Sequence, residues 1–540
     1  MDEEHIIYGD ELKVPVPNVS VGIQLHNALK QNKDVPILID TFTGDRISSK
    51  TLLNTASRLG NSLKNFGLTN QDIIGVCSEN NLHFFDPVLA ALFAGITLTT
   101  FSSQYTEREL TYIANLSQPS VIFCSVETVS TVLKIEAQLK RVPKIIIINH
   151  EEDYKGCQCV KNFISENISK TFDVDAYEPV PVNIKDDVAT ILYSSGTTGF
   201  PKGVMITHLN ISTVFAIYMD GRYGLQRSPC IAFVPFYHTY GLFLVLRKFI
   251  FVSYVLIMKK FVTHIYLQAI QDYNIEELQV VPSVAQLLAK TDLLNNYDMS
   301  SVKSISCAGA PLSKHIEELL QKRLKVDNVR QRYGMTETTV GFMGHKVNKR
   351  YPSGTCGDVF PSVSVKVVDL ETGKALGSMK TGEICCRGNV VMKGYLNNSE
   401  ATNEMIDIDG WLHTGDIGFY DSNKTFFVVD RIKDLIKCKG FQVAPVELEA
   451  LLLNHSKIAD AGVIGIPDER YGEIPLAFIV KVQGENLSEK EVENFVAGKV
   501  APYKRLRGGV KFVPQIPRNP SGKILRRMLR NEVNKFKSNL

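Results

Sequence analysis

The chain runs through the apolar residues Val188-Ala189-Thr190-Ile191-Leu192 and continues directly into Tyr193-Ser194-Ser195-Gly196-Thr197-Thr198-Gly199-Phe200-Pro201-Lys202-Gly203. This order predicts a buried strand followed by a loop of hydroxyls, glycines and one lysine. Such a loop can wrap a polyphosphate, because glycines let the backbone approach while N–H groups, hydroxyls and a cation meet the negative charge. The spacing differs from that of a Walker A loop, G-x-x-x-x-G-K-[ST]. Taken alone, these residues are also typical of a polar surface turn, so the rest of the chain decides between the two interpretations.

The bulk composition is that of an ordinary globular protein with more than one domain. The chain has 540 residues, of which 44% are apolar and 22% charged, and this length exceeds what a single core usually supports. A net charge of +3 gives no support to nucleic-acid binding. The ten cysteines lack the spacing of a structural zinc site, which indicates reduced thiols in an intracellular protein.

No segment of the sequence indicates secretion or a membrane span. The N-terminal residues are acidic and are not followed by an apolar signal segment. The run from Phe249 to Met258 is strongly apolar but has only about half the length of a span, and we interpret it as a buried strand. The C-terminal Ser538-Asn539-Leu540 is a degenerate form of the peroxisomal signal S-K-L, so the sequence is compatible with a peroxisomal or a cytoplasmic protein.

Apolar runs alternate with helical patterns through most of the first 430 residues. Apolar residues recur at helical spacing from Leu52 to Phe66, and Gly67 stands where a C-cap glycine belongs. Lys144-Ile145-Ile146-Ile147-Ile148 predicts a buried strand of the parallel type, and Ser313 is placed to cap a helix after the strand Ser304 to Cys307. The alternation predicts an α/β fold of layered, mostly parallel sheets, in which ligands gather at the carboxyl ends of strands.

The pattern changes near Asp430-Arg431. Beyond it lie about 110 residues, a length that suits a small domain, with strands predicted over 461–466 and 476–482 and helices over 489–497 and 524–536. We therefore predict an N-terminal domain over residues 1–430 and a small α+β C-terminal domain over residues 431–540.

Four further patches of polar residues lie downstream of the loop. They are Arg332-Tyr333-Gly334-Met335-Thr336-Glu337-Thr338-Thr339, Gly410-Trp411-Leu412-His413-Thr414-Gly415-Asp416, Asp430-Arg431-Ile432-Lys433-Asp434-Leu435-Ile436-Lys437-Cys438-Lys439-Gly440-Phe441-Gln442 and Asn519-Pro520-Ser521-Gly522-Lys523. A tyrosine ring can stack on adenine, a glutamate beside phosphates can hold Mg²⁺, and an aspartate suits ribose hydroxyls. Each patch alone is also typical of a helix start, a turn or a solvated face.

In order and spacing, the loop and these patches resemble the successive motifs of the adenylate-forming superfamily, which includes acyl-CoA synthetases, 4-coumarate–CoA ligases and beetle luciferases. The resemblance extends from Ile23 to about Leu529. It implies that a carboxylate attacks the α-phosphate of ATP to give an acyl-adenylate and pyrophosphate, and that a thiol then displaces AMP. The implied ligands are ATP, Mg²⁺, CoA and a small carboxylic acid.

The resemblance also implies a role for individual residues. The catalytic residues are Lys523 for adenylation, Lys437 for thioester formation, and His238, Thr336 and Glu337, with Glu337 holding the metal. The implied ATP- and AMP-binding residues are Ser194, Ser195, Gly196, Thr197, Thr198, Gly199, Lys202, Gly309, Ala310, Pro311, Gln331, Tyr333, Gly334, Met335, Asp416, Arg431, Lys433 and Gln442. Lys260, Lys439 and Gly440 match the CoA side, while His238, Tyr240 and Val340 match the acyl pocket. The C-terminal domain is implied to rotate about Asp430-Arg431 between the two steps.

The acyl pocket departs from the beetle luciferases. Tyr237 and Thr239 flank His238 where luciferases typically carry a second histidine and a small residue, and Val340 replaces a residue that is often serine. Arg332 replaces a usual glycine, so its side chain is expected to point away from the nucleotide. Specificity depends on such pocket contacts.

These features favour an ATP-dependent ligase that joins a fatty or aryl-propenoic acid to CoA. The alternative is a luciferase that oxidises a luciferyl-adenylate with O₂. A binding protein that has lost activity is disfavoured, because every charged residue expected for turnover is present: Lys202, Glu337, Asp416, Arg431, Lys437 and Lys523. The sequence specifies no oligomeric state.

Overall fold

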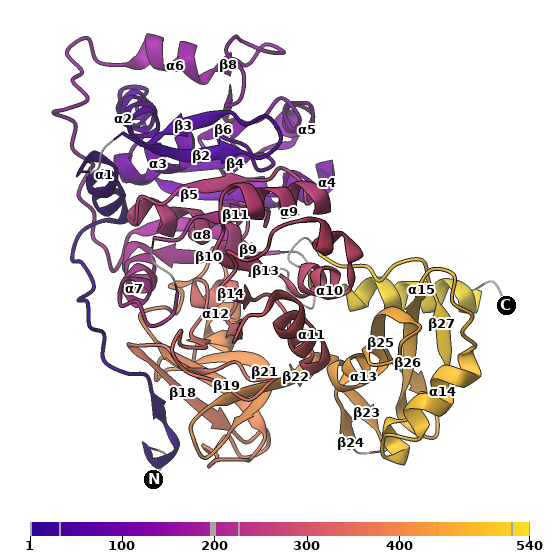
Figure 1. Ribbon diagram of the computed structural model, residues 1–540. Coiled ribbons are helices and arrows are strands. Elements are labelled where there is room, and N and C mark those ends of the chain that lie inside the picture. The colour runs from indigo at the N-terminus through magenta and orange to yellow at the C-terminus, as the bar shows by residue number, and fades with distance from the viewer. Residues whose placement is uncertain are drawn as a thin grey trace.

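Five β-sheets organise the fold (Figure 1). The computed structural model describes residues 3–31, 34–194, 201–224, 227–439, 441–519 and 522–538. The largest sheet has eight strands, and its parallel core confirms the α/β prediction. In spatial order its strands are β20 (Gly394–Tyr395), β10 (Lys202–Thr207), β9 (Val188–Ser194), β5 (Thr97–Phe101), β4 (Ile73–Cys77), β6 (Val121–Cys124), β7 (Lys144–Ile147) and β8 (Gln158–Cys159).

Two smaller sheets of the N-terminal part also have parallel cores. One orders β11 (Cys230–Ala232), β12 (Val255–Ile257), β2 (Pro36–Asp40) and β3 (Arg46–Ser48), and the other orders β13 (Glu277–Val280), β14 (Ser304–Cys307), β15 (Val329–Tyr333), β16 (Met343–Gly344) and β17 (Asp358–Val359). In each sheet the last strands turn antiparallel. The carboxyl ends of β14 and β15 lead into the segments that carry Gly309 and Tyr333-Gly334, as expected for ligand-binding loops.

One sheet of the N-terminal part is antiparallel throughout, which the alternating pattern did not reveal. Its order is β1 (Ile7–Tyr8), β18 (Val363–Val368), β19 (Gly382–Gly388), β21 (Leu412–Tyr420) and β22 (Phe426–Arg431). The pairs β18–β19 and β21–β22 are consecutive in sequence and need no crossover helix, whereas β20 and α12 (Ser399–Met405) lie between β19 and β21, and β1 joins from the N-terminus. It therefore adds an all-β layer to the predicted α/β architecture, at the lower left of Figure 1.

The C-terminal residues form a separate unit, at the right of Figure 1. Its sheet orders β24 (Phe441–Val443), β23 (Ile436–Cys438), β26 (Gly472–Lys481) and β25 (Ile458–Asp468), with β27 (Val510–Phe512) beside β26. The helices α13 (Pro445–Leu453), α14 (Glu489–Ala497) and α15 (Arg526–Ser538) pack on it. Its two main apolar clusters contain only residues of this unit, so the small α+β domain has its own core, and one small cluster joins Leu435 and Ala444 to Ile417 of β21. The boundary at residue 430 stays a prediction, and β22 runs through it to Arg431.

The helices of the N-terminal part cover the sheets. They are α1 (Val21–Gln31), α2 (Ser49–Asn65), α3 (Phe85–Ala94), α4 (Glu107–Ser117), α5 (Val129–Ile135), α6 (Val160–Asn167), α7 (His208–Met219), α8 (Thr239–Ile250), α9 (Thr263–Asp272), α10 (Pro282–Lys290), α11 (Lys314–Leu324) and α12 (Ser399–Met405). The predicted cap of α11 is confirmed, since Ser313 Oγ accepts a hydrogen bond from Ile316 N. No helix within the described ranges has both the length and the apolar character needed to cross a membrane.

The apolar run from Phe249 to Met258 is not the single buried strand that the sequence predicted. Its first two residues complete α8, the chain then turns, and only Val255–Ile257 forms the strand β12. Val252 adopts a left-handed φ of 46° in that turn. The run is buried, as predicted, but an apolar stretch does not reveal by periodicity where a buried helix ends and a buried strand begins.

Candidate active site

A cleft of about 1360 Å³ lies between the N-terminal part and the C-terminal unit. Parts of the chain that are far apart in sequence meet there: the β9–β10 hairpin, the 3₁₀ turn Thr336–Thr338, the end of β22, and the loop before α15. The predicted site residues on its wall are Ser194, Lys202, His238, Tyr240, Gly309, Tyr333, Gly334, Met335, Thr336, Glu337, Val340, Arg431, Lys433 and Lys523. One cavity therefore gathers residues predicted for the nucleotide, the acid and the metal.

The β9–β10 hairpin positions the predicted phosphate-binding residues. Ser194 pairs with Lys202 across the two strands, so the connecting loop starts and ends at the cleft. Lys202 Nζ lies 4.8 Å from the ring centroid of Tyr395. The predicted residues within the loop, Ser195, Gly196, Thr197, Thr198 and Gly199, are outside the described part of the chain.

Glu337 is a buried carboxylate on the cleft wall. Its Oε1 accepts a hydrogen bond of 2.8 Å from the Tyr395 hydroxyl, and its carbonyl oxygen accepts one of 2.9 Å from Met392 N. These contacts hold Glu337 in place and leave Oε2 without a protein partner among the described residues. A fixed carboxylate on the wall of the cleft that also carries the predicted phosphate-binding residues Ser194 and Lys202 fits Mg²⁺, which prefers oxygen ligands and usually takes one or two carboxylates beside phosphates.

Asp416 follows Thr414 and Gly415 in sequence. Those two residues line the cleft, whereas Asp416 is absent from its described wall. The Tyr333 hydroxyl donates a 2.5 Å hydrogen bond to its Oδ2, and Arg431 Nε lies 3.0 Å from its Oδ1. Burial and the neighbouring carboxylate hold the pKa of Tyr333 well above its usual range, so the hydroxyl remains a donor. Residues from three separate sequence patches are thus joined by one hydrogen bond and one ion pair.

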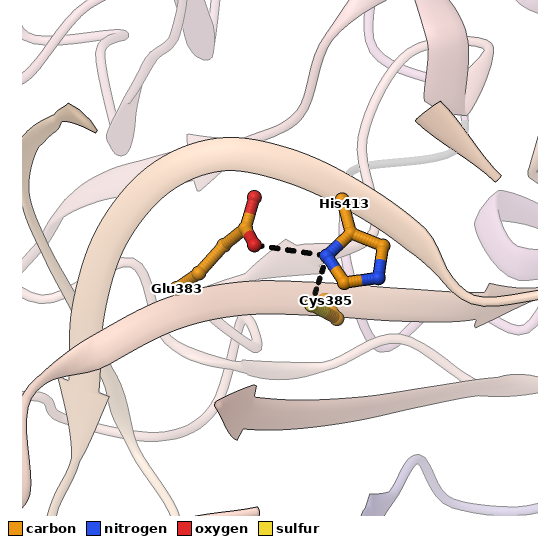
Figure 2. A group of neighbouring side chains, drawn as sticks. All are labelled: Glu383, Cys385 and His413. Carbon is orange, nitrogen blue, oxygen red and sulfur yellow. Dashed lines mark hydrogen bonds and ion pairs between the residues drawn. The ribbon is translucent and has the colours of Figure 1, made fainter. Parts of the chain in front are cut away.

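Figure 2 shows a cluster that sequence reasoning missed, made of Glu383, Cys385 and His413. His413 Nδ1 lies 2.8 Å from Glu383 Oε2 and 3.4 Å from Cys385 Sγ, while Glu383 Oε1 accepts a 2.9 Å hydrogen bond from Gly415 N. Glu383 therefore anchors the turn that presents Asp416. Burial raises the pKa of the Cys385 thiol, which disfavours a thiolate metal ligand, and we assign this cluster a positioning role.

Gln331 is hydrogen-bonded to the residue that follows the Gly309-Ala310-Pro311 segment. Gln331 is buried, and its Oε1 accepts a 3.2 Å hydrogen bond from Leu312 N while its Nε2 donates to Glu317. Gly309 lines the cleft, whereas Ala310, Pro311 and Gln331 are absent from its described wall. The structure thus places Gln331 behind the predicted adenine-side segment.

His238 forms the start of α8 and lines the cleft. Burial lowers its pKa to about 4, so the imidazole is neutral near pH 7. Asn80 clamps the preceding segment, because its side chain donates to Val234 O at 3.1 Å and accepts from Phe236 N at 2.9 Å. A rigid segment therefore presents a neutral imidazole to the cavity.

Gly241 permits that segment to approach α8. A Cβ at this position would lie 2.3 Å from Pro235 O and 2.7 Å from Val234 O. We expect Gly241→Ala to destabilise the protein by about 1–3 kcal/mol, since backbone must move to relieve the overlap. Thermal denaturation measures the effect. Gly498→Ala is the matched control, because its Cβ would meet nothing closer than 3.5 Å, and an equal loss in both variants would contradict the close-approach argument.

Lys523 reaches the cleft from the C-terminal unit. Its loop is closed by hydrogen bonds from Lys523 N to Asn519 Oδ1 and from Asn519 N to Lys523 O, each 2.8 Å long. Gly522 lies against Val281 and Ser283 at the start of α10, which fixes the loop to the N-terminal part. Burial, together with the nearby charge of Arg431, lowers the pKa of Lys523 to about 8.

The residues predicted for the CoA step lie elsewhere, and so does Gln442, which was predicted for the nucleotide. Lys437, Lys439 and Gln442 belong to the β23–β24 hairpin and are exposed, and Lys260 is exposed on the N-terminal part. None of the four lines the cleft as described. Gly440 is outside the described residues.

Comparison with known proteins gives the family. Residues 25–396 match the family described as AMP-binding enzyme, and residues 447–523 match the AMP-binding enzyme C-terminal domain. The chain belongs to the AMP-binding enzyme family. Its fold is that of the adenylate-forming superfamily, as the sequence motifs indicated.

This AMP-binding enzyme is similar to both luciferases and CoA ligases. It is 43% identical to a luciferin 4-monooxygenase of Photuris pensylvanica, with 100% of each chain covered. It is 35% identical to a 4-coumarate–CoA ligase of Humulus lupulus, covering 98% of this chain and 97% of the relative. Family membership therefore establishes an adenylate-forming enzyme and leaves the final reaction to the site.

Among solved structures, this AMP-binding enzyme resembles ATP-bound MatB from Rhodopseudomonas palustris. The identity is 26%, the TM-score is 0.83, and 95% of this chain and 99% of that chain are covered. Against apo MatB, with the same coverage, the TM-score is 0.73. The overall arrangement of the two parts is thus more similar to the ATP-bound form.

Proposed function

We propose that the protein is an ATP- and Mg²⁺-dependent carboxylate–CoA ligase that acts through an enzyme-bound acyl-adenylate. The observation that carries the proposal is the placement of the lysines on the C-terminal unit. Lys523 lies inside the cleft with Glu337 and Arg431, while Lys437 and Lys439 are exposed on a separate hairpin. In Figure 1 that hairpin, β23–β24, lies at the other end of the unit from the start of α15. Two lysine-bearing faces suit two successive half-reactions.

In the first half-reaction the acid's carboxylate oxygen bonds to the α-phosphorus, and the bond from that phosphorus to the bridging oxygen breaks to release pyrophosphate. An anion approaches a polyanion, so the protein's task is alignment and neutralisation of charge. Lys523 would neutralise the carboxylate and α-phosphate, and Lys202 would meet the β- and γ-phosphates. Mg²⁺ held by Glu337 would supply further charge neutralisation at the phosphates.

In the second half-reaction the thiol sulfur of CoA bonds to the acyl carbon, and the bond from that carbon to the AMP oxygen breaks. We propose that the C-terminal unit turns about Asp430-Arg431 to bring Lys437 and Lys439 to the adenylate. Asp430 would lie at the hinge. Its carboxylate accepts hydrogen bonds from Arg431 N at 2.7 Å and from Val446 N at 3.0 Å. These bonds keep the end of β22 attached to the start of α13. Domain rotation is an established way to reuse one substrate pocket.

The acid would enter beside His238. The wall beyond it includes Val214, Tyr240, Phe243, Leu244 and Val340, which form a mainly apolar channel. Such a wall suits an aliphatic or aryl tail. The neutral imidazole of His238 can accept or donate a hydrogen bond without placing a full charge beside that tail.

The deciding experiment supplies the purified protein with ATP, Mg²⁺, CoA and a panel of fatty, cinnamic-type and luciferin-type acids. Mass spectrometry then searches for acyl-CoA and for acyl-AMP. We expect an acyl-CoA product whose formation requires ATP. Accumulation of acyl-AMP without any thioester would contradict the ligase proposal.

A second candidate function is that of a luciferase, an O₂-dependent monooxygenase acting on a luciferyl-adenylate. The 43% identity to a luciferin 4-monooxygenase favours it. Against it, Arg332 reaches into the pocket region, and Tyr237 flanks His238. Light emission with luciferin and ATP in the absence of CoA would support this alternative.

The pKa of Lys523 predicts the pH dependence of adenylation. A lysine loses its positive charge as the pH rises through its pKa, and this pKa is lowered to about 8. We therefore expect kcat/KM for ATP–pyrophosphate exchange, which reports the free enzyme, to fall as the pH rises above about 8. In Lys523→Arg the guanidinium stays charged, so this fall should disappear whatever the absolute rate. If kcat/KM falls at the same pH in both proteins, the titrating group is not Lys523.

A further inference from the structure

The inner end of the cleft carries more positive than negative charge. Three guanidinium groups, those of Arg247, Arg330 and Arg332, surround a single carboxylate, that of Glu277. Burial by itself would raise the pKa of Glu277, but these arginines and the ammonium group of Lys248 override it and hold the pKa at about 2. Guanidinium groups keep their charge in proteins, so one carboxylate leaves the group with a surplus of positive charge.

Glu277 is already occupied by two of the arginines. Arg330 Nη2 donates to Glu277 Oε1 and, at 2.9 Å, to Ser304 Oγ. Arg332 Nη2 lies 4.0 Å from the same carboxylate oxygen and also donates to Tyr223 O, while its Nη1 donates to the Tyr218 hydroxyl. These contacts satisfy much of Arg330 and Arg332 but offer nothing to Arg247.

Arg247 acts on Glu277 only through space and has no direct contact with a carboxylate within the described residues. Its side chain is 6% exposed and lies over the Tyr218 ring, with Cζ 4.1 Å from the ring centroid. Within the described part of the chain it makes no ion pair and no hydrogen bond. A buried charge is costly unless it is paired, so an anion bound at this position would complete an ion pair with Arg247.

Arg247 and Arg332 both line the cleft, and their Cζ atoms lie 4.1 and 5.0 Å from the centroid of the Tyr218 ring. On α8 the lining residues Tyr240, Phe243, Leu244 and Arg247 follow the spacing of one helix face. Arg247 therefore lies about 10 Å beyond Tyr240 along the helix axis. His238, these apolar side chains and the two guanidinium groups thus line one cleft, and among the lining residues of α8 Arg247 is the furthest from His238.

Two further polar atoms near this end are unpartnered. The Tyr240 hydroxyl and Ser306 Oγ are buried, and neither has a hydrogen-bond partner among the described residues. Both residues line the cleft. They add donors to the same region in which Arg247 lacks an anion.

We propose that the acid substrate is a dicarboxylate, whose second carboxylate is bound by Arg247 and Arg332 at the inner end of the channel. This rests on the proposed function, that the cleft activates a carboxylic acid near His238 and Lys523. The planar fork of a guanidinium binds a carboxylate through two parallel hydrogen bonds, which a hydrocarbon end cannot form. The first carboxylate goes to the α-phosphate, and the second remains unchanged.

The primary test compares matched pairs of acids on the wild-type protein. Adipic, suberic, sebacic and dodecanedioic acids are paired with hexanoic, octanoic, decanoic and dodecanoic acids, and terephthalic acid with benzoic acid. ATP–pyrophosphate exchange gives kcat/KM for each. We expect the best dicarboxylate to exceed its monocarboxylate partner by about 10- to 100-fold, the effect of charge-assisted hydrogen bonds. Equal or better activation of every monocarboxylate would overturn the proposal.

Variants then assign the preference to Arg247. Arg247→Gln should lower kcat/KM for the preferred dicarboxylate by about 10- to 100-fold and so remove the preference, and Arg247→Lys should retain part of it because a positive charge remains. Arg350→Gln is the control, because Arg350 is 84% exposed and its ion pair of 3.7 Å with Asp327 lies on the surface. An unchanged preference in Arg247→Gln would overturn the assignment.

A binding measurement separates this inference from the ligase proposal. Isothermal titration of wild type and of Arg247→Gln with each dicarboxylate of the panel needs no turnover. If no acid gives an adenylate or a thioester but a dicarboxylate binds in an Arg247-dependent way, the ligase proposal fails and the anion site stands. If neither activation nor binding is observed, both fail.

Discussion

Replacing Lys523 by alanine is expected to slow formation of the acyl-adenylate by about 10²–10³-fold, the loss that follows removal of one donor from a developing negative charge. The physical reason is geometric as well as electrostatic. Lys523 is held in the cleft by hydrogen bonds to Asn519, and the adjacent Gly522 packs on the start of α10, so its ammonium group has a fixed position. ATP–pyrophosphate exchange measures this half-reaction directly.

The matched variant is Lys437→Ala, on the exposed β23–β24 hairpin. We expect it to leave exchange near the wild-type rate and to slow thioester formation from a supplied acyl-adenylate, while Lys523→Ala shows the reverse pattern. Mass spectrometry of acyl-CoA follows the second half-reaction. Equal loss of both half-reactions in both variants would refute the assignment of the two faces.

Glu337→Gln is the second variant with a large expected effect. The amide keeps the size of the side chain and an oxygen that can accept from the Tyr395 hydroxyl, but it removes the negative charge. If Glu337 holds Mg²⁺, adenylation should fall by about 10²–10³-fold at ordinary Mg²⁺ concentrations. The Mg²⁺ concentration that gives half-maximal exchange should rise, because a neutral oxygen binds the ion less tightly.

Tyr395→Phe is the graded control for this prediction. It removes the 2.8 Å hydrogen bond that orients Glu337 but leaves the carboxylate in place. Outer-shell partners of a metal ligand typically contribute about 10- to 100-fold, so its effect should be smaller than that of Glu337→Gln. If Glu337→Gln shows an unchanged Mg²⁺ dependence, the metal is held by other groups.

Some of the site could be predicted from neighbouring residues alone. The strand before the phosphate loop, the cap at Ser313 and the strand at Lys144–Ile147 were predicted and confirmed, because each depends on residues within a few positions. The run from Phe249 to Met258 was predicted wrongly, because burial on all sides removes the periodicity that distinguishes a helix from a strand.

Other features required the assembled chain. Glu383 belongs to no motif, yet it anchors Gly415 across paired strands of the antiparallel sheet, and Tyr395 reaches Glu337 from a short edge strand. No local pattern indicates either contact, since each joins segments more than 30 residues apart. The same holds for Arg247, whose missing counter-ion is evident only once Arg330 and Arg332 are seen to share Glu277.

From its order of residues, then, this protein is recognisable as an adenylate-forming enzyme, because the motifs predicted to contact nucleotide are short and contiguous. Tertiary structure decided what those motifs do together. It placed Lys523 in the cleft and Lys437 outside it, buried His238 so that its imidazole is neutral, and left Arg247 beside the channel without an anion. Such properties arise from which distant segments pack against one another and how much water they exclude, and these depend on the whole fold rather than on any one stretch of chain.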